Sequence, residues 1–372
     1  MHTPLYDIDK TYLENAEKGP FFKGTIPSRK WPDKKEWIDF LGFPLASRIG
    51  VPAGPLLNSR WIGLASELGY DLLFYKTIRS RAHPGHPLPN IIFLNEPKQL
   101  SPTSLPPTLT KSVTVPDYNV LAITNSFGMP SRDPHYLLND IPLANSLVKK
   151  GQVVVVSIVG SGTGPHFLQD FVQASSLAKD CGAHIIEANF SCPNVTGSEG
   201  SLYEDPQAVF DISSAIIKAI RPIPLILKFG LFPSLSTMRK TFIEAARAGV
   251  QAVAGINTIS MKVTDVNGNP ALGPGRLTSG VCGAPIRDAA LDFVRDSRSI
   301  IDKEKLDLTL LGCGGILLPE HFTAFLEAGA DFALTATGMM WDPYLAMKYH
   351  TGKVQNYDQP RTHLEAARNS SR

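Results

Sequence analysis

The sequence lacks several features that would place it in a specialised class. The 372-residue chain has no stretch of 18 apolar residues, so a membrane-spanning helix is not expected. Its first twenty residues contain no apolar run of the secretory-signal type. The four cysteines, Cys181, Cys192, Cys282 and Cys313, form no CxxC pair, so no metal site is expected. We therefore expect a cytoplasmic protein with free thiols, with peripheral association with a membrane as the alternative.

Charge of one sign is not in excess either. The 36 Lys and Arg residues against 34 Asp and Glu give a net charge of +2, which argues against a nucleic-acid-binding protein with a broad basic face. Hydrophobic residues make up 43% of the chain, enough for a substantial core, so whole-chain disorder is excluded. The length allows two or three domains, or one large α/β barrel with insertions.

Nine short, β-rich apolar runs alternate with helical patterns along most of the chain. Continuous apolar runs fit strands that are buried on both faces, and their alternation with helices predicts a parallel α/β fold. The predicted strands span 48–53, 72–78, 120–125, 153–159, 184–190, 225–229, 252–258, 309–312 and 332–335. The predicted helices span 167–175, 205–220, 235–249, 284–301 and 319–329.

Eight of the nine runs fit a (β/α)8 TIM barrel. The segment from 79 to 119 carries eight prolines and no amphipathic helix, whereas a parallel crossover is usually helical. The run at 120–125 is therefore predicted to be an excursion over the barrel mouth. The predicted domains are an N-terminal extension at 1–37, a barrel at 38–350 with a Pro-rich insertion at about 79–150 after the second strand, and a polar C-terminal tail at 351–372.

Polar residues cluster where the predicted strands end, which is where such barrels carry their active sites. Lys76 ends the second strand, Asn189 the fourth, Lys228 the fifth and Asn257 the sixth. Lys and Asn are poor strand residues, and a buried Lys needs a partner. Two lysines in these places indicate a device that stabilises an anion; salt bridges with nearby carboxylates are the alternative.

Small residues follow the last two predicted strands, at Gly314-Gly315 and at Ala336-Thr337. Barrels often bind phosphate there, on backbone N–H groups and a helix N-terminus, and glycine lets the backbone come close to the phosphate. These residues therefore predict a phosphate cradle, and ordinary turns are the alternative. We expect Cys313 to pack beside this turn rather than to react.

Two sequence blocks resemble the dihydroorotate dehydrogenases, most closely the soluble class 1 enzymes. Asn-Phe-Ser-Cys-Pro-Asn at 189–194 is similar to the Asn-Leu-Ser-Cys-Pro-Asn signature of that family. Asn-Ser-Phe-Gly-Met-Pro at 125–130 resembles its substrate loop, and the segment 282–287 resembles a further turn that contacts the flavin. The resemblance covers about residues 38–345 and again implies an FMN-binding (β/α)8 barrel.

The resemblance implies FMN and the oxidation of (S)-dihydroorotate to orotate in de novo pyrimidine (UMP) biosynthesis. Cys192 would take the C5 proton and FMN the C6 hydride, because no side chain accepts a hydride. A free thiol has a pKa of about 8.5, near enough to neutrality for proton transfer, although an inert buried thiol is the alternative. A single phosphate cradle, with no Gly-x-Gly-x-x-Gly turn after a strand, favours FMN over FAD.

The resemblance also assigns the site residues. Cys192, Lys76 and Lys228 are the predicted catalytic residues, with Lys228 at the N1/O2 edge of the flavin. Asparagine amides offer both donors and acceptors to a pyrimidine. The predicted substrate-binding residues are Lys76, Asn125, Phe127, Gly128, Met129, Asn189, Asn194, Asn257 and Thr258. The predicted cofactor-binding residues are Ala53, Gly54, Lys76, Thr77, Asn125, Asn189, Lys228, Ile256, Cys282, Gly283, Gly314, Gly315, Ala336 and Thr337.

The electron acceptor is left open by the resemblance. Quinone-linked class 2 enzymes use a serine as the base and have an N-terminal pair of amphipathic helices, whereas class 1 chains lack so long an extension. The expected acceptors are fumarate, NAD through an iron–sulfur partner, or a quinone, in that order. Class 1 relatives suggest a homodimer.

Two other functions remain as alternatives. A dihydropyrimidine dehydrogenase-like barrel that acts on uracil or thymine shares the Asn-Phe-Ser-Cys-Pro block, but that family tends to have His where this chain has Asn194. A barrel that binds a phosphorylated metabolite without redox chemistry explains the glycines. It does not explain Cys192 together with Lys228 and the asparagines.

Overall fold

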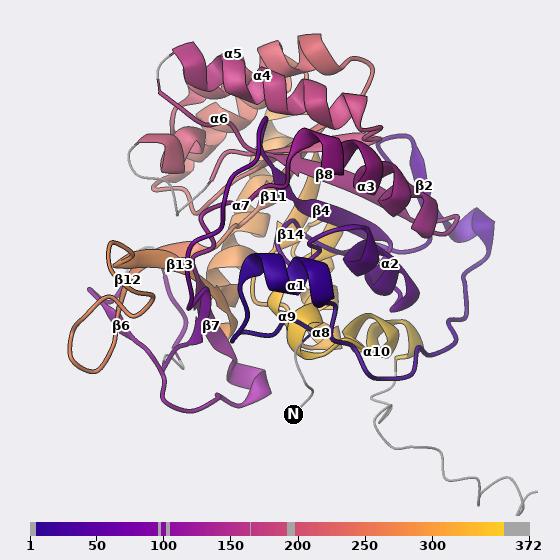
Figure 1. Cartoon of the computed structure of the whole chain (residues 1–372). Coiled ribbons are helices and arrows are strands. Elements are labelled where there is room, and N and C mark those ends of the chain that lie inside the picture. Colours follow the sequence, from indigo (N-terminus) through magenta and orange to yellow (C-terminus); the bar gives the residue numbers. More distant parts are fainter. Residues whose placement is uncertain (1–4, 96–97, 102–104, 164, 192–197, 353–372) are drawn as a thin grey trace, which may run out of the picture.

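Eight parallel strands in the described part of the chain close into a barrel, which confirms the predicted (β/α)8 TIM fold (Figure 1). The computed structural model describes residues 5–95, 98–101, 105–163, 165–191 and 198–352. The strands follow one another around the barrel in chain order, and the last pairs with the first. They are β3 (Ile49–Val51), β4 (Leu72–Ile78), β8 (Val153–Ile158), β9 (Ile185–Asn189), β10 (Leu225–Lys228), β11 (Ala252–Gly255), β14 (Thr309–Cys313) and β15 (Phe332–Leu334).

Helices cover the outside of the barrel between successive strands. The five predicted helices are present as α4 to α8. Asp205 caps α5 by accepting hydrogen bonds from the N–H groups of Gln207 and Ala208, as its Asp-Pro start signal predicts. Helix α7 begins at Arg287 rather than at the predicted residue 284, because residues 284–286 form a separate 3-10 turn, η4 (Ala284–Ile286). The helices are α2 (Ser59–Glu67), α3 (Pro134–Leu147), α4 (Pro165–Asp180), α5 (Pro206–Ile220), α6 (Leu235–Ala248), α7 (Arg287–Glu304), α8 (Pro319–Glu327), α9 (Thr337–Trp341) and α10 (Leu345–Thr351).

Helix α3 was not predicted from the sequence. It follows the Pro-rich segment and contains Pro142, which obscures its helical pattern. Its start signal, Asp133-Pro134, is the same as that of α5, and Asp133 accepts a hydrogen bond from the N–H of Tyr136 at 3.0 Å. Because α3 packs against α2 and β8, it is the crossover helix between the second and third barrel strands.

A five-stranded sheet stands beside the barrel mouth, in the order β5-β7-β13-β12-β6 (Figure 1). Strand β7 holds the run at 120–125, so the prediction that this run is an excursion from the barrel is confirmed. The hairpin β12–β13, which leaves the barrel after β11, was not predicted. The strands are β5 (Ile91–Phe93), β6 (Leu109–Thr110), β7 (Ala122–Asn125), β12 (Ile259–Thr264) and β13 (Thr278–Gly283), and the 3-10 turn η2 (Tyr118–Val120) precedes β7.

The interior of the barrel is apolar in its lower part, at the amino ends of the strands, and polar in its upper part, at their carboxyl ends. Alternate residues of the strands point inward. The lower interior is filled by Leu72, Phe74, Val153, Val155, Ile185, Ile226, Ala252, Ala254, Leu311, Phe332 and Leu334. It is closed underneath by the hairpin of β1 (Ile38–Phe40) and β2 (Phe43–Leu45), whose Phe40 ring packs edge-on against Phe332 at 4.7 Å. The same alternation turns Glu187 and Lys228, two residues after Ile185 and Ile226, into the upper interior.

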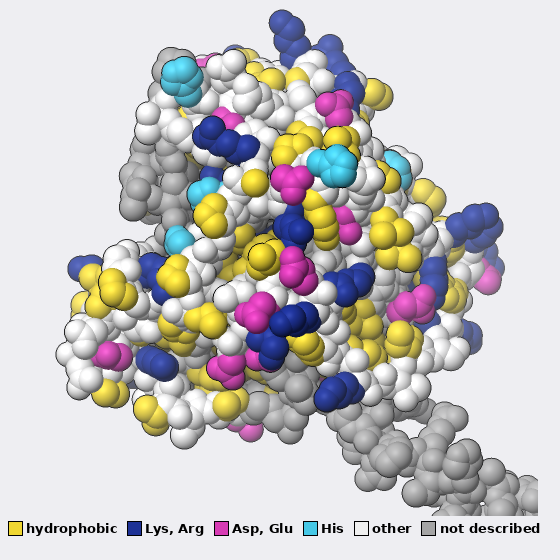
Figure 2. Space-filling model, in the orientation of Figure 1, with side chains coloured by type: hydrophobic (Ala, Val, Ile, Leu, Met, Phe, Trp, Pro, Cys, Tyr) yellow, Lys and Arg dark blue, Asp and Glu magenta, His cyan; other side chains and the backbone are white. Residues whose placement is uncertain are grey.

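The N-terminal extension contains the helix α1 (Tyr12–Lys18) and the 3-10 turn η1 (Lys34–Glu36), neither of which was predicted. Thr11 and Glu14 form a capping box, a Thr-x-x-Glu signal that is readable in the sequence. In Figure 1, α1 lies across the front of the barrel beside α9. On this face acidic and basic side chains are interspersed (Figure 2), and Arg132 binds Glu17 of α1 at 3.2 Å. None of the helices in the described part of the chain has both the length and the apolar composition needed to cross a bilayer.

Candidate active site

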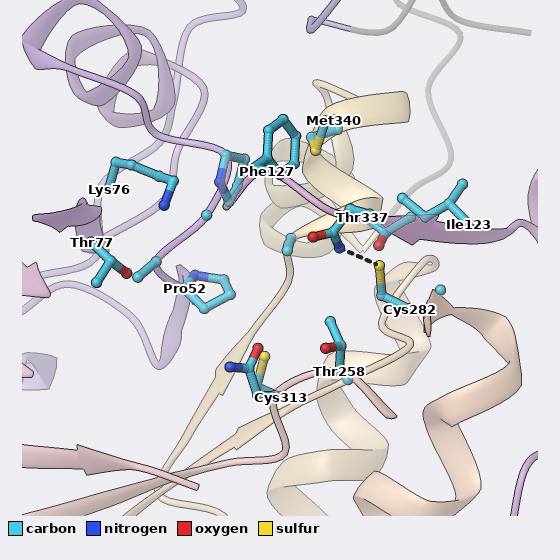
Figure 3. A pocket seen from close by; sticks show the side chains of 18 of the residues that line it. Pro52, Lys76, Thr77, Ile123, Phe127, Thr258, Cys282, Cys313, Thr337 and Met340 are labelled. Carbon is cyan, nitrogen blue, oxygen red and sulfur yellow. Dashed lines mark hydrogen bonds between the residues drawn. The ribbon is translucent and has the colours of Figure 1, made fainter. Parts of the chain in front are cut away.

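A cavity opens at the carboxyl ends of the barrel strands, between the strand ends, the five-stranded sheet and the N-terminal extension (Figure 3). It encloses about 1230 Å³ of non-protein space, including the open solvent at its mouth. Barrel enzymes carry their chemistry at this end, so this cavity is the candidate active site.

Nearly all of the predicted site residues that the structure describes line this cavity. Cys192 and Asn194 lie outside the described residues. Gly128 is described but does not line the cavity. Its φ of +74° and the His86 ring, which would stand 2.6 Å from an added Cβ, make it a glycine-specific turn between Phe127 and Met129, which do line the cavity. The binding roles of the lining residues stay predictions.

Lys228 is a buried cation at the cavity wall. Its side chain is 4% exposed, and its Nζ donates a weak hydrogen bond to Cys313 Sγ at 3.9 Å. In the described part of the chain no carboxylate forms an ion pair with Lys228, so a structural salt bridge is not supported at this position. Its charge therefore lies at the cavity wall, in a low-dielectric interior where it acts strongly on its surroundings.

Glu187 was not predicted as a site residue, yet it lines the cavity on the strand beside Lys228. Its side chain is 1% exposed, and among the described residues its Oε2 has no hydrogen-bond partner. Burial raises the pKa of the Glu187 carboxyl above its ordinary value, while the Lys228 charge and a hydrogen bond with Ser157 oppose that shift. Burial and the Lys228 charge therefore act on the Glu187 carboxyl in opposite directions.

Two further polar residues connect to this group. The Ser157 hydroxyl lies 3.0 Å from the Thr77 hydroxyl, so a hydrogen-bonded chain runs from Glu187 to the predicted cofactor residue Thr77. The inward position of Glu187 could have been found from the sequence, because it lies two residues before Asn189 on the same predicted strand. It was missed because no signature of the resemblance points to it.

Two free thiols also line the cavity. Asn125 donates a hydrogen bond from Nδ2 to Cys282 Sγ at 3.5 Å (Figure 3). Burial raises the pKa of Cys282 to about 11, and it also raises the pKa of Cys313, where the Lys228 charge opposes the shift. Both thiols are therefore protonated near neutral pH and are poor bases. This agrees with the expectation that Cys313 packs rather than reacts.

The asparagines Asn189 and Asn257 are held together at the point where the chain enters the signature block. Asn257 Nδ2 donates to the carbonyl oxygen of Ser191 at 2.6 Å and lies 3.5 Å from Asn189 Oδ1. Asn189 Oδ1 accepts from the N–H of Ser191 at 3.2 Å. These contacts fix the backbone of Ser191, the residue before Cys192, and hold both amides at the cavity wall.

The residues present fit a phosphorylated cofactor with a polar ring. At the end of β14 the cavity wall contains two glycines with positive φ, where an added Cβ would lie 2.7 Å from Ala290 Cβ for Gly314 and 2.9 Å from the N atom of Arg287 for Gly315. The Thr258 Oγ1 atom is buried in the wall and has no hydrogen-bond partner among the described residues. Glycine backbone lets a phosphate approach closely, and an unpartnered hydroxyl suits the donors and acceptors of a flavin ring.

Several lining residues could not be found from motifs. Most are apolar and belong to segments far apart in the chain, including two tyrosines of the N-terminal extension. The lining residues that the sequence did not predict are Tyr6, Tyr12, Pro52, Pro55, Leu57, Ile91, Ile123, Glu187, Ile286, Cys313, Ile316 and Met340. In Figure 3, Phe127 and Met340 lie at one end of the cavity, with Thr258 and Cys313 at the other.

The fold and the cavity define a (β/α)8 barrel enzyme with its ligand site at the carboxyl ends of the strands. The family model for dihydroorotate dehydrogenase matches residues 113–352. A dihydroorotate dehydrogenase of Dictyostelium discoideum is 52% identical over 366 residues, which cover 96% of this chain and 99% of that relative. The chain therefore belongs to the dihydroorotate dehydrogenase family, whose members are flavin-dependent oxidoreductases.

More distant relatives share part of the chain. The NAD-dependent dihydropyrimidine dehydrogenase subunit PreA of Escherichia coli K12 is 29% identical over 212 residues, 55% of this chain and 49% of that protein. The catalytic subunit of dihydroorotate dehydrogenase B (NAD(+)) from Alkaliphilus oremlandii is 27% identical over 207 residues, 55% of this chain and 64% of its own. The ligand-free dihydroorotate dehydrogenase structure of Eimeria tenella superposes with a TM-score of 0.66 at 16% identity, over 91% of both chains, which shows the shared fold.

Proposed function

We propose that this chain catalyses the FMN-dependent oxidation of (S)-dihydroorotate to orotate in de novo pyrimidine biosynthesis. The observation that carries the proposal is 52% identity with a dihydroorotate dehydrogenase over nearly the full length of both chains. The cavity supports it, because Lys76, Lys228 and the amides of Asn125, Asn189 and Asn257 line the same cavity. Action on uracil is less favoured, since the dihydropyrimidine dehydrogenase subunit is only 29% identical, against 52% for the dihydroorotate dehydrogenase of Dictyostelium discoideum.

In the proposed reaction the C5–C6 bond of dihydroorotate becomes a double bond as a proton leaves C5 and a hydride leaves C6. Bound FMN supplies the hydride acceptor. Cys192, as a thiolate, takes the C5 proton. Asn125, Asn189 and Asn257 orient the ring through paired donor and acceptor contacts. Lys228 offsets the negative charge that develops at the cofactor, and it acts in a water-poor site where a fixed charge is most effective.

Anaerobic mixing of the purified holoprotein with dihydroorotate tests this function. We expect the flavin absorbance to bleach with dihydroorotate and not with dihydrouracil or dihydrothymine. Mass analysis of the cofactor released by denaturation should give FMN, as the single phosphate cradle predicts. A cofactor identified as FAD would contradict the cofactor proposal, and bleaching by dihydrouracil alone would contradict the substrate proposal.

Replacing Lys228 with alanine is expected to lower the flavin content and the flavin reduction potential. The flavin gains negative charge when it is reduced. Removing a buried positive charge beside it would therefore destabilise the reduced form relative to the oxidised form. We expect the two-electron potential to fall by about 30 mV or more, a shift equivalent to about 1.4 kcal/mol. The potential can be measured by redox titration against reference dyes.

The matched control for this variant is Lys262→Ala. Lys262 lies on the exposed face of β12 and does not line the cavity, so its loss removes the same charge without touching the site. It should leave the potential unchanged. A Lys228→Ala protein with full flavin content and the wild-type potential would refute the proposed role of Lys228.

The electron acceptor and the oligomeric state are proposed from the class 1 resemblance, and the location is proposed from the sequence. Fumarate is proposed as the acceptor, ahead of NAD through an iron–sulfur partner and of a quinone. Reoxidation of the dihydroorotate-reduced protein by each acceptor in turn, followed at flavin wavelengths, separates the three. Sedimentation analysis tests the proposed homodimer, and fractionation of the source cell tests the proposed cytoplasmic location against peripheral association with a membrane.

A further inference from the structure

We propose that Tyr6 is a positioning residue of the ligand site, through which docking of the N-terminal segment and binding of the substrate-class ligand favour each other. The N-terminal segment is defined here as residues 5–21. The inference rests on the proposed function, because it takes the loop at 125–130 to bind dihydroorotate and orotate. It assigns to the extension a part in ligand binding.

The N-terminal segment contacts two elements at one end of the cavity. The N–H of Leu5 donates to the carbonyl oxygen of Met340 in α9 at 2.9 Å, which ties the segment to the helix that follows the last barrel strand. The next residue, Tyr6, packs edge-on against Phe127 of the predicted substrate loop, with ring centroids 5.7 Å apart and an interplanar angle of 81°. All three residues Tyr6, Phe127 and Met340 line the cavity.

A hydrogen-bonded turn before α1 holds Tyr6 against the loop. Asn15 is fully buried and organises the turn before α1: its Oδ1 accepts from the N–H of Asp7 at 2.8 Å, and its Nδ2 donates to the carbonyl oxygens of Asp7, Lys10 and Thr11. The Tyr6 side chain is consequently 1% exposed, and its ring also lies 6.3 Å from that of Trp61. Tyr6 therefore has a fixed place against the loop.

Further contacts anchor the segment to the barrel. Asn58 Nδ2 donates to the carbonyl oxygen of Ala16 at 2.6 Å, and Arg60 donates to the same oxygen at 2.7 Å. The N–H of Phe21 donates to the carbonyl oxygen of Leu5 at 3.1 Å, so the segment closes on itself. Loosening any part of this structure would loosen Tyr6 as well.

The loop that Tyr6 contacts has an unusual backbone conformation. Gly128 and Met129 both have positive φ, +74° and +53°, and a non-glycine residue such as Met129 is rarely found there. Inside the insertion the loop is held by hydrogen bonds from Arg79 Nε to the Met129 carbonyl at 2.9 Å and from the His86 N–H to the Phe127 carbonyl at 2.9 Å. Tyr6 adds a contact from a different part of the chain, on the Phe127 ring.

Coupling of this kind is reciprocal. If a docked segment holds the loop in its binding conformation, a ligand that binds the loop must in turn favour the docked segment. If Tyr6 had a purely structural role, replacing it would lower the stability of the protein and leave its affinity for the ligand unchanged. The two roles therefore differ in ligand affinity and in the response of the segment to ligand.

The first test compares orotate binding to the holoproteins of wild type, Tyr6→Ala, Tyr6→Phe and Phe22→Ala, followed by the shift of flavin absorbance. Tyr6→Ala should weaken orotate binding about 2- to 12-fold, the value of one edge-to-face aromatic pair. Tyr6→Phe keeps the ring contact and should bind orotate like wild type. Phe22→Ala is the matched control, because Phe22 belongs to the same extension but packs edge-on against Tyr344 at 5.8 Å and does not line the cavity.

The second test follows trypsin cleavage after Lys18, an exposed residue at the end of α1, in the wild-type holoprotein. Saturating orotate should slow this cleavage, whereas the same concentration of a non-binding anion such as benzoate should not. Tyr6→Ala binding orotate as tightly as wild type, or cleavage that orotate leaves unchanged, would overturn the inference. Failure of wild type to bind orotate at all is a separate result, which would overturn the proposed function.

Discussion

Serine in place of Cys192 is expected to leave FMN and orotate binding intact while slowing flavin reduction by dihydroorotate about 100- to 10,000-fold at neutral pH. A hydroxyl ionises much less readily than a thiol, so an unassisted serine is a poor base. The two thiols that line the cavity cannot act as the base in its place, because burial raises the pKa of Cys282 to about 11 and raises that of Cys313 as well. Stopped-flow reduction across a pH series measures the effect.

Two controls make this experiment decisive. Cys181→Ser removes a buried thiol that does not line the cavity, so it should reduce flavin at the wild-type rate. Orotate binding checks that the geometry of the Cys192→Ser site is preserved. The wild-type rate should rise with pH as Cys192 ionises, and the serine variant should need a higher pH. A Cys192→Ser rate within a factor of about three of wild type, where the loss of a base costs at least 100-fold, would show that another group is the base.

Replacing Arg29 with methionine should lower the free energy of unfolding by about 3–5 kcal/mol, the cost of leaving a buried charge without its partner. Arg29 binds both oxygens of Asp71 at 2.6 and 2.7 Å, and the Asp71 side chain is fully buried at the start of β4. Ser47 and Gln152 also donate to Asp71, but neither supplies a charge. The contact fastens the extension to the barrel.

Urea unfolding at a fixed excess of FMN measures this effect, because bound cofactor itself adds stability. The double variant Arg29→Met with Asp71→Leu is the matched control. It removes the whole buried pair, so it should recover much of the lost stability. Loss of an exposed ion pair changes the free energy of unfolding by no more than about 1 kcal/mol. If Arg29→Met alone had so small an effect, Asp71 would be well solvated without its partner, and the expectation would be wrong.

The barrel could be predicted because its strands carry a local signal. The run from Leu72 to Ile78 is buried along its whole length, and such continuous apolar runs are readable without any partner. Helix α5 begins where Asp205-Pro206 predicts. The hairpin β12–β13 and the pairing of β13 with β7 depend on residues far apart in the chain, so no local pattern indicates them. Helix α1 carries a readable capping box that was overlooked.

The candidate site likewise contains residues that could be predicted from the sequence and residues that could not. Lys76, Lys228 and the glycines after β14 were found because strand-end position and motif order mark them, and the structure places them on one cavity. Tyr6 faces this cavity only because the extension folds back over it, which is a tertiary contact without a sequence motif. Glu187 was missed for a different reason: no signature of the resemblance points to it, although its inward position follows from its spacing to Asn189 on the same predicted strand.

The hydrogen bond between Leu5 and Met340 has a consequence for biosynthesis. A ribosome releases the N-terminal segment early, whereas α9 emerges near the end of translation, so the segment made first acquires its partner last. Closing so long a loop is slow. The cavity is therefore completed only after almost the whole chain has been synthesised. A protein fused ahead of Leu5 would be tethered at the rim of that cavity.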